Sequence, residues 1–487
     1  MNCQCTGPNG PETRTTSRRE FLRRSGGGFG MLALASILDS ESLLAGSDAS
    51  PKITPSNPLL PKTPHFATKA KNVIFLFMSG GPSHVDLFDL KPDLIRLAGQ
   101  PIPESFGTFK TRRAVAKNKL MPPVRPFRKH GQCGMDVSDF LPHIAGCVDD
   151  ICLLRGCYGD SVTHPESVYL MNTGSILMGR PSLGAWATFG LGTENQNMPA
   201  YVVMPDPTGW VKGGAPAWGN GYMPAVFQGT ILRGGESPIL HLNNPKGVTP
   251  AQQQATVDFI NQLNREDLRP GEENSELAAR ISAYELAFRM QAHAPELVDL
   301  AAETEATRKL YGLDNKTTAE FGLRCLLARR MVERGVRFVQ LYCGDTNGWD
   351  GHSAVEDNHA KLCAQSDQPV AGLLKDLKSR GLLDSTLVIW GGEFGRMPMS
   401  EGSDGRDHNP HGFCMWLAGG GVKGGTIIGA TDPVGLRAAE EKTHVHDIHA
   451  TLLHLLGLDH TRLTYRHNGR DERLTDVSGE VIRKALA

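Results

Sequence analysis

The sequence predicts an α/β protein with a mixed, mostly parallel sheet that helices cover on both faces. Three largely apolar runs support this class: residues 72–78, 336–343 and 386–390. Runs of this kind are typical of strands that are buried on both faces of a parallel sheet. The second and third runs each follow a stretch with helical spacing, residues 317–334 and 368–380. Helix followed by buried strand, repeated along a chain, indicates the α/β class.

Length and composition describe a globular chain without a strong overall charge. The chain has 487 residues, 40% hydrophobic and 21% charged, which excludes disorder of the whole and allows a large core. Its 51 basic residues nearly balance 52 acidic ones, so we expect no nucleic-acid partner. The ten cysteines contain no CxxC zinc pattern. We expect buried free thiols, with oxidation of a pair among Cys147, Cys152 and Cys157 left open.

The first 46 residues have the anatomy of a signal peptide. A charged segment with the pair Arg18-Arg19 precedes a short apolar stretch at residues 29–38 and a small-residue exit. The pair resembles the twin-arginine consensus, which implies passage through the Tat translocase to the periplasm or the extracellular space. The apolar stretch is too short for a permanent membrane span. The alternative is an amphipathic helix with chance arginines.

The rest of the chain divides into a linker, one domain and a tail. Residues 47–68 are rich in Pro, Ser and Lys and indicate a linker. We expect an α/β domain over residues 69–460, with a helical insertion at about residues 249–313, which includes an expected helix at residues 275–292. Residues 461–487 form a polar tail without clear periodicity.

Polar residues collect directly after the predicted strands, where open α/β sheets bind their ligands. The carboxylates and imidazoles that we take as candidate metal ligands are Asp86, His164, Asp350, His352, Glu393, His408 and His411. Such oxygen and nitrogen donors suit Zn, Mn, Ca or Mg, which the sequence does not distinguish. Two adjacent metals would clamp the attacking and leaving oxygens of a phosphate or sulfate ester. The alternative for each residue is a helix cap or a turn.

Several motifs resemble those of the domain-of-unknown-function family 1501, over roughly residues 70 to 485. They are Ser79-Gly80-Gly81-Pro82-Ser83-His84-Val85-Asp86, Gly348-Trp349-Asp350-Gly351-His352, Gly392-Glu393-Phe394-Gly395-Arg396, Gly405-Arg406-Asp407-His408 and residues 446–457. That family is grouped with the alkaline phosphatase-like fold, whose better-known members are phosphatases, sulfatases and cofactor-independent phosphoglycerate mutases. The resemblance therefore implies an alkaline phosphatase-like core and ester hydrolysis.

The sequence also departs from the wider superfamily. An Asp usually follows the first strand there, whereas Ser79-Gly80 stands here, so that Asp86 or Asp89 would have to substitute. The usual Ser-Asp-His-Gly metal motif aligns with Gly392 to Gly395, which keeps a carboxylate as Glu393 and loses the histidine. A formylglycine motif of the sulfatase kind does not occur. The site therefore holds two metals, one metal or none.

Two residues are candidates for catalysis. Phosphatase-like relatives attack the ester with a Thr or Ser at the start of a helix, and Thr163 has that position here. The alternative is an N-cap, since Glu166 follows three residues later as in a capping box. Arg396 follows the third predicted strand, where a guanidinium would bind an ester oxyanion. Its alternative is a structural pair with Asp404 or Asp407.

These observations predict an exported, metal-dependent hydrolase of a sulfate or phosphate ester, either small or part of a polysaccharide. The alternative is a non-catalytic binding or cell-surface assembly protein on the same fold, because the expected Asp and the Asp-His motif are altered. The six Trp residues, among them Trp186, Trp210 and Trp218, line a carbohydrate-accepting surface or pack in the core. The sequence gives no indication of the oligomeric state.

Overall fold

A computed structural model of the chain describes residues 57–233, 247–266, 282, 285–286, 288–291, 295–344 and 346–487. The predicted export signal and the start of the linker lie outside the described residues, as does much of the helix expected at residues 275–292. Among the helices that are described, none combines the length and the apolar character that a membrane crossing requires.

The centre of the domain is a nine-stranded sheet. Its strands are β1 (Asn72–Met78), β4 (Ile151–Tyr158), β5 (Tyr201–Met204), β6 (Thr230–Ile231), β7 (Phe338–Cys343), β8 (Thr386–Gly391), β11 (Phe413–Ala418), β12 (Thr426–Ile428) and β15 (Thr443–His444). They run in the order β12-β4-β11-β8-β1-β7-β5-β6, with β15 paired to β4. Among the described strands of this sheet, β11 is antiparallel to both of its neighbours, and the other pairs are parallel. The predicted mixed, mostly parallel sheet is confirmed.

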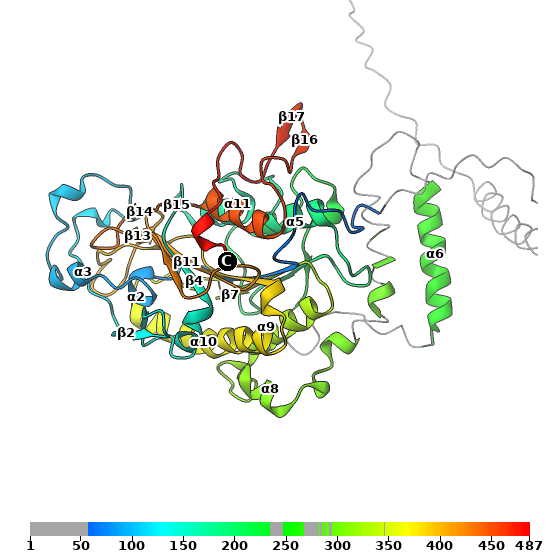
Figure 1. The fold of residues 1–487 in the computed structure, drawn as a ribbon, viewed down its shortest axis with the longest axis horizontal. Coiled ribbons are helices and arrows are strands. Elements are labelled where there is room, and N and C mark those ends of the chain that lie inside the picture. The colour runs from blue at the N-terminus through cyan, green and yellow to red at the C-terminus, as the bar shows by residue number, and fades with distance from the viewer. Residues whose placement is uncertain are drawn as a thin grey trace, which may run out of the picture. The chain divides into compact units, whose positions relative to one another are not determined.

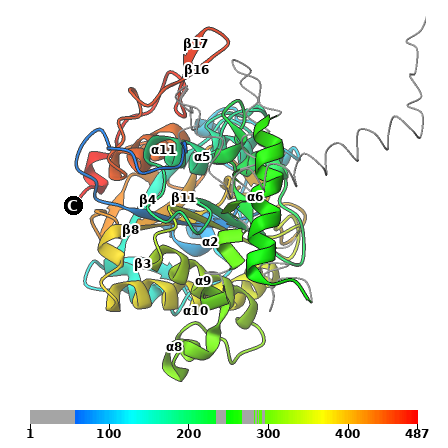
Figure 2. The same ribbon diagram turned by 90° about the vertical axis from the view of Figure 1, so that its right-hand side faces the viewer.

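Two apolar layers cover the sheet, as the alternation of side chains along a strand requires. Alternate residues of β1 enter different core clusters: Leu76 belongs to one and Phe77 to the other. Helices α9 (Ala319–Glu333) and α10 (Val355–Ser379) supply the first layer. Helices α4 (His164–Thr173), α5 (Leu183–Leu191) and α11 (Val445–Leu455) supply the second. Figures 1 and 2 show α9 and α10 on one side of the sheet and α5 and α11 on the other.

The apolar runs of the sequence become the central strands. β1 spans residues 72–78 as predicted, and β7 and β8 lie within two residues of the predicted bounds. The six buried residues of β1 each contribute about 1.5–3 kcal/mol through burial of a large apolar side chain. The helix expected at residues 368–380 is longer than predicted, because α10 begins at Val355. The first turn of α10 is polar, so the spacing of apolar residues that predicts a helix is weak there.

Shorter elements surround the sheet. They are α2 (His84–Leu87), α3 (Pro92–Arg96), α6 (Pro250–Glu266), α8 (Glu305–Leu310), β2 (Phe127–His130), β3 (Met135–Ser138), β9 (Gly395–Arg396), β10 (His408–Asn409), β13 (Ala430–Thr431), β14 (Ala438–Glu440), β16 (Tyr465–His467) and β17 (Arg470–Glu472). Helices α6 and α8 fall in the predicted helical insertion. Within the predicted tail, β16 and β17 form a hairpin and Ala485 is buried. The eight cysteines of the described residues are free thiols, and all of them except Cys133 are buried, as predicted.

Four strands of the sheet, β1, β4, β7 and β8, have their carboxyl ends on the same side of the molecule. β1 lies between β7 and β8 and is parallel to both. β11 is antiparallel to β8 and to β4, so β4 runs in the same direction as β8. The segments that follow β1, β4, β7 and β8 therefore meet beyond the carboxyl ends of the strands, at the kind of position where open α/β sheets bind ligands.

Candidate metal centre

Backbone contacts tie the loops after β1, β7 and β8 together. The Trp349 amide donates to the Ser79 carbonyl at 2.9 Å. The Gly80 amide donates to both carboxylate oxygens of Glu393, at 3.0 and 3.1 Å. Gly80 has φ +111, and a Cβ there would lie 2.7 Å from the Asp350 amide nitrogen, so only glycine fits. The loop thus fixes the Asp350 backbone and the Glu393 side chain in one place.

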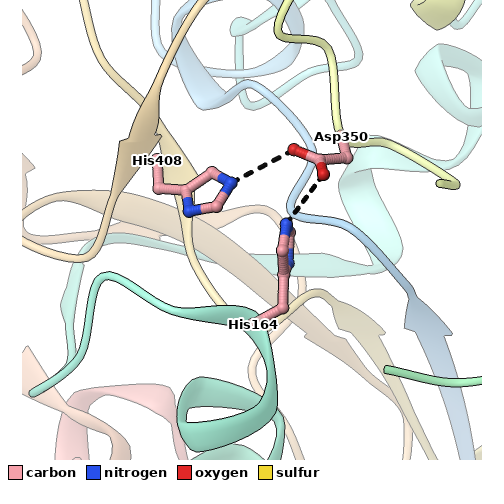
Figure 3. A group of neighbouring side chains, drawn as sticks. All are labelled: His164, Asp350 and His408. Atoms are coloured by element: carbon pink, nitrogen blue, oxygen red, sulfur yellow. Dashed lines mark hydrogen bonds and ion pairs between the residues drawn. The ribbon is translucent and has the colours of Figure 1, made fainter. Parts of the chain in front are cut away.

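Asp350 is the centre of a group of three histidines. The Nε2 atoms of His164, His352 and His408 lie 2.9, 3.0 and 3.1 Å from its carboxylate oxygens. Figure 3 shows Asp350 between His164, at the start of α4, and His408, in β10. The Nε2 atoms of His352 and His408 lie 2.9 Å apart. Four of the seven candidate ligands predicted from the sequence therefore share one centre.

The second ring nitrogen of each histidine faces a hydrogen-bond acceptor. Nδ1 of His164 donates to Glu393 at 2.6 Å, and Nδ1 of His352 donates to Glu401 at 2.5 Å. Nδ1 of His408 donates to the Val162 carbonyl at 2.7 Å. These acceptors assign the ring proton to Nδ1, so in the neutral imidazole Nε2 carries a lone pair. Metal-binding histidines are held by the same kind of outer contact.

The Nε2 lone pairs and the Asp350 carboxylate are donors that could hold a metal ion between them. Burial lowers the pKa of His408 to about 3 against the opposing effect of Asp350, so this imidazole is neutral. Nε2 of His164 is buried and has no hydrogen-bond partner, although it lies 2.9 Å from Asp350. A single proton shared between the Nε2 atoms of His352 and His408 would still leave Nε2 of His164 without a hydrogen-bond partner. Imidazole nitrogen is a common ligand of Zn, whereas Ca and Mg prefer oxygen ligands.

Asp407 extends the group. With His352 and His408 it forms a second set of side chains whose ligand atoms lie within 4.8 Å of one another. One Asp407 oxygen accepts from the His408 amide at 2.8 Å, and the other accepts from the Arg113 amide at 2.7 Å. The Asp407 side chain is fully buried.

Two cations contact Asp350 directly. The ammonium of Lys212 lies 2.6 Å from one carboxylate oxygen, and the guanidinium of Arg396 donates to the other at 2.7 Å. Burial raises the pKa of Asp350, but its close contacts with the three histidines and the charge of Arg396 outweigh burial and hold the pKa far below its usual range. Asp350 is therefore ionised at every physiological pH.

Arg396 is fully buried, and its donors are engaged by the protein. It donates to the carbonyls of Gly80, Gly81 and Arg406 as well as to Asp350. Asp350 is thus its acidic partner, in place of the Asp404 or Asp407 that the sequence left open. These contacts make Arg396 a residue that positions Asp350, and its contact with substrate stays a prediction.

Thr163 is the N-cap residue of α4, but its side chain makes no capping hydrogen bond. Its hydroxyl lies 3.3 Å from the Ser161 hydroxyl, which in turn donates to the Glu166 carboxylate. Glu166 therefore bonds Ser161 rather than completing a capping box. The residues on both sides of Thr163 contact the centre, Val162 through His408 and His164 through Asp350.

Three predicted ligands, Asp86, Glu393 and His411, lie outside both ligand sets of the described residues. Glu393 instead accepts hydrogen bonds from Nδ1 of His164 and from the Gly80 amide. Asp86 is buried and pairs with Arg406 through two contacts of 2.8 and 3.1 Å. Burial raises its pKa, but the charge of Arg406 and the Ser83 hydroxyl outweigh burial and keep the pKa below the usual value. His411 donates from Nε2 to the Lys110 carbonyl at 2.9 Å.

Sequence reasoning missed two side chains at the centre. Lys212 lies in a loop after β5 rich in Gly and Pro, where no motif marks it. Glu401, which holds His352, follows a run of Met, Pro and Ser between two recognised motifs. An acidic residue between the Gly-Glu-Phe-Gly-Arg and Gly-Arg-Asp-His motifs was the one signal that pointed to it.

A family comparison covers almost the whole described domain. The sequence model of the family described as "Protein of unknown function (DUF1501)" matches residues 70–486. The chain belongs to the DUF1501 family. No match is found among curated proteins.

Solved structures similar to this DUF1501 protein have low sequence identity. The lipoteichoic acid synthase LtaP from Listeria monocytogenes is 10% identical, with 87% of this chain and 78% of that chain covered and a TM-score of 0.37. The PsFucS1 sulfatase from Pseudoalteromonas sp. is 13% identical, with 80% and 68% covered and a TM-score of 0.34. The alkaline phosphatase from the Antarctic bacterium TAB5 is 13% identical, with 74% and 93% covered and a TM-score of 0.29. TM-scores of this size carry no argument about substrate or activity.

Proposed function

We propose that this DUF1501 protein is an exported, metal-dependent hydrolase of sulfate or phosphate esters. One observation carries the proposal: three imidazoles, each held through Nδ1, turn Nε2 toward the single carboxylate of Asp350. Asp350 and the three histidines would hold a divalent cation, with Asp407 beside two of them. When bound, such a cation supplies Lewis-acid polarisation of an ester oxygen. The signal predicted at residues 1–46 supports export.

The surrounding residues keep this arrangement in place before substrate arrives. Glu393 and Glu401 orient two imidazoles, and Arg396 anchors Asp350 to the loop after β1. Preorganised groups of this kind lower the barrier because they need not rearrange as charge develops. The Lys212 side chain is partly exposed and places a positive charge beside Asp350, where an ester oxyanion would lie.

The proposed nucleophile is the Thr163 hydroxyl. Its oxygen bonds to phosphorus or sulfur while the bond to the alcohol oxygen breaks, and its proton passes through Ser161 to the Glu166 carboxylate. The departing alkoxide takes up the proton that Glu166 received and leaves as the alcohol. Water then attacks the Thr163 ester, restores the hydroxyl and releases phosphate or sulfate, so one water is consumed per ester.

Metal analysis tests the proposal. Protein purified without chelator is expected to contain near-stoichiometric Zn or Mn, and Asp350→Ala and His408→Ala are each expected to lose it. Asp160→Ala is the matched control, because the Asp160 carboxylate is exposed and pairs with His444 at 3.2 Å. A wild-type protein that binds no metal after incubation with Zn, Mn or Ca would overturn the proposal and favour the non-catalytic alternative.

A further inference from the structure

We propose that residues 110–119, the basic strap, bind neighbouring anionic groups of a polymer, so that the substrate is an acidic polysaccharide. The ester cleavage itself rests on the proposed function above. The strap contains five basic residues and no acidic one, and all five are exposed: Lys110, Arg112, Arg113, Lys117 and Lys119. The whole chain has a net charge of −1, so this density of positive charge is local.

The strap lies against the loop that carries the metal centre. The Arg113 amide donates to Asp407 at 2.7 Å, and the Arg113 guanidinium lies 3.4 Å from Glu401. The strap also accepts hydrogen bonds through its backbone, from His411 to the Lys110 carbonyl and from Ser400 to the Lys119 carbonyl, both at 2.9 Å. These contacts fix the strap at both ends beside His352 and His408.

The charges of the strap are largely unneutralised. Within the part of the chain that the structure describes, Arg113 alone of the five basic side chains forms an ion pair. Like charges on a short segment repel one another and raise the local concentration of anions. A substrate with a single anionic group, bound at the centre, would contact few of the basic side chains of the strap. A polymer with repeated anionic groups would contact several of these side chains at once.

An exposed indole near the centre favours a polysaccharide as the polymer. Trp210 is 72% exposed, whereas the other five Trp side chains are buried. It lies two residues before Lys212, which contacts Asp350. Both flanks of its loop are anchored, by Asp206 to the Gly344 amide at 3.0 Å and by Gly213 to the Tyr169 hydroxyl at 2.8 Å. A flat aromatic face of this kind can cover the C–H face of a sugar ring.

Binding of labelled dextran sulfate to the full chain tests the inference, with and without metal. The strap variant is Arg112→Gln/Lys117→Gln/Lys119→Gln, and the control variant Lys316→Gln/Lys423→Gln/Lys442→Gln removes three exposed charges elsewhere. We expect the strap variant to bind about tenfold more weakly, the control variant to bind like wild type, and binding to weaken with salt. Trp210→Ala is also expected to weaken binding, and turnover of a small aryl ester is expected to be unchanged in the strap variant.

Three results would overturn the inference. The first is equal affinity of the strap and control variants for dextran sulfate. The second is binding of single-stranded DNA as tight as that of dextran sulfate, which would assign the strap to nucleic acid. The third is turnover of a small ester without binding of dextran sulfate, which would refute the role of the strap and leave the proposed function in place. Binding of dextran sulfate that depends on the strap, without turnover of any ester, would instead refute the proposed function and leave the strap as a binding segment.

Discussion

At the scale of single residues, the identity of the site depends on the hydrogen bonds of the second ring nitrogen. A neutral histidine presents a lone pair from Nε2 only when Nδ1 holds the proton. Here Nδ1 of each of the three histidines donates a hydrogen bond, to Glu393, to Glu401 or to the Val162 carbonyl. With this proton placement, three Nε2 lone pairs face one carboxylate, and a cation between them would relieve their repulsion. This set of contacts, more than the number of His and Asp residues, indicates a metal centre.

Thr163 provides the residue-scale prediction. Thr163→Ser keeps the hydroxyl and is expected to keep turnover of 4-nitrophenyl phosphate or sulfate within a few-fold, whereas Thr163→Val is expected to lose at least about 100-fold. Glu166→Gln removes the proton acceptor of the Ser161 chain and is expected to cost about tenfold. Metal content is expected to stay at the wild-type value in all three variants.

Full turnover in Thr163→Val with metal bound would contradict this role and leave water as the attacking group. Loss of metal in the same variant would instead show that Thr163 supports the ligands. The serine variant separates the two cases, because it restores the hydroxyl without the methyl group.

The sequence predicted those site residues that sit in short motifs directly after a strand. Asp350 and His352 share one Gly-rich motif, and His408 lies in another, so their types and their proximity to strand ends could be inferred. Lys212 could not be predicted, and Glu401 was marked only by its place between two motifs, because long loops bring both residues to the centre. Asp86 follows the same strand-end rule, yet its carboxylate lies against Arg406, a contact that sequence alone does not determine.

At the scale of elements, the loop after β1 acts on the centre through its backbone. Ser79 and Gly80 follow the strand directly. The Gly80 amide donates to Glu393 and the Gly80 carbonyl accepts from Arg396, so one residue links the loops after β1 and β8. The positive φ of Gly80 lets this backbone approach Trp349 and Asp350 closely.

Gly80→Ala is therefore expected to reduce metal affinity and stability together. Its φ of +111 costs about 1–3 kcal/mol with a side chain, and the added Cβ would lie 2.6 Å from the Trp349 amide nitrogen. Gly99→Ala is the control, since Gly99 has φ +78 but nothing within 4 Å of an added Cβ. Chemical denaturation and metal titration of both variants measure the difference. Equal metal affinities in the two variants would show that the close approach is unimportant for the centre.

The positions of helices and strands could be predicted from the sequence where most of their residues are buried. β1 buries six of its seven residues and α9 buries eleven of its fifteen, so the apolar pattern located both well. The start of α10 has Glu356, Asp357 and Asn358 in its first turn, and these hid the helix from an apolar pattern. β9 and β10 are two residues each and exist because the site loops pair with one another, which no local sequence signal specifies.

At the scale of the whole molecule, burial of neutral histidines links stability to pH. His449, in α11, is fully buried, and burial lowers its pKa to about 3 against the opposing effect of a hydrogen bond to the Met171 carbonyl. The neighbouring His446 and His444 lower its pKa further. The layer of α4, α5 and α11 therefore contains an imidazole that stays neutral through the whole neutral and mildly acidic range.

The sign of the effect follows from the two pKa values. Above pH 6.5 His449 is neutral in both the folded and the unfolded chain, and it contributes no pH dependence. Between pH 6.5 and about 3 the unfolded chain binds a proton that the folded chain excludes, so stability falls as pH falls, by about 1.4 kcal/mol per pH unit from this residue. His449→Gln keeps a donor for the Met171 carbonyl and has no titrating group. Its free energy of unfolding, measured by denaturant titration between pH 7 and 4.5, is expected to fall less steeply than that of wild type. Parallel curves for the two proteins would show that His449 gains its proton within the folded state, and that the layer over this face of the sheet opens to water in acid.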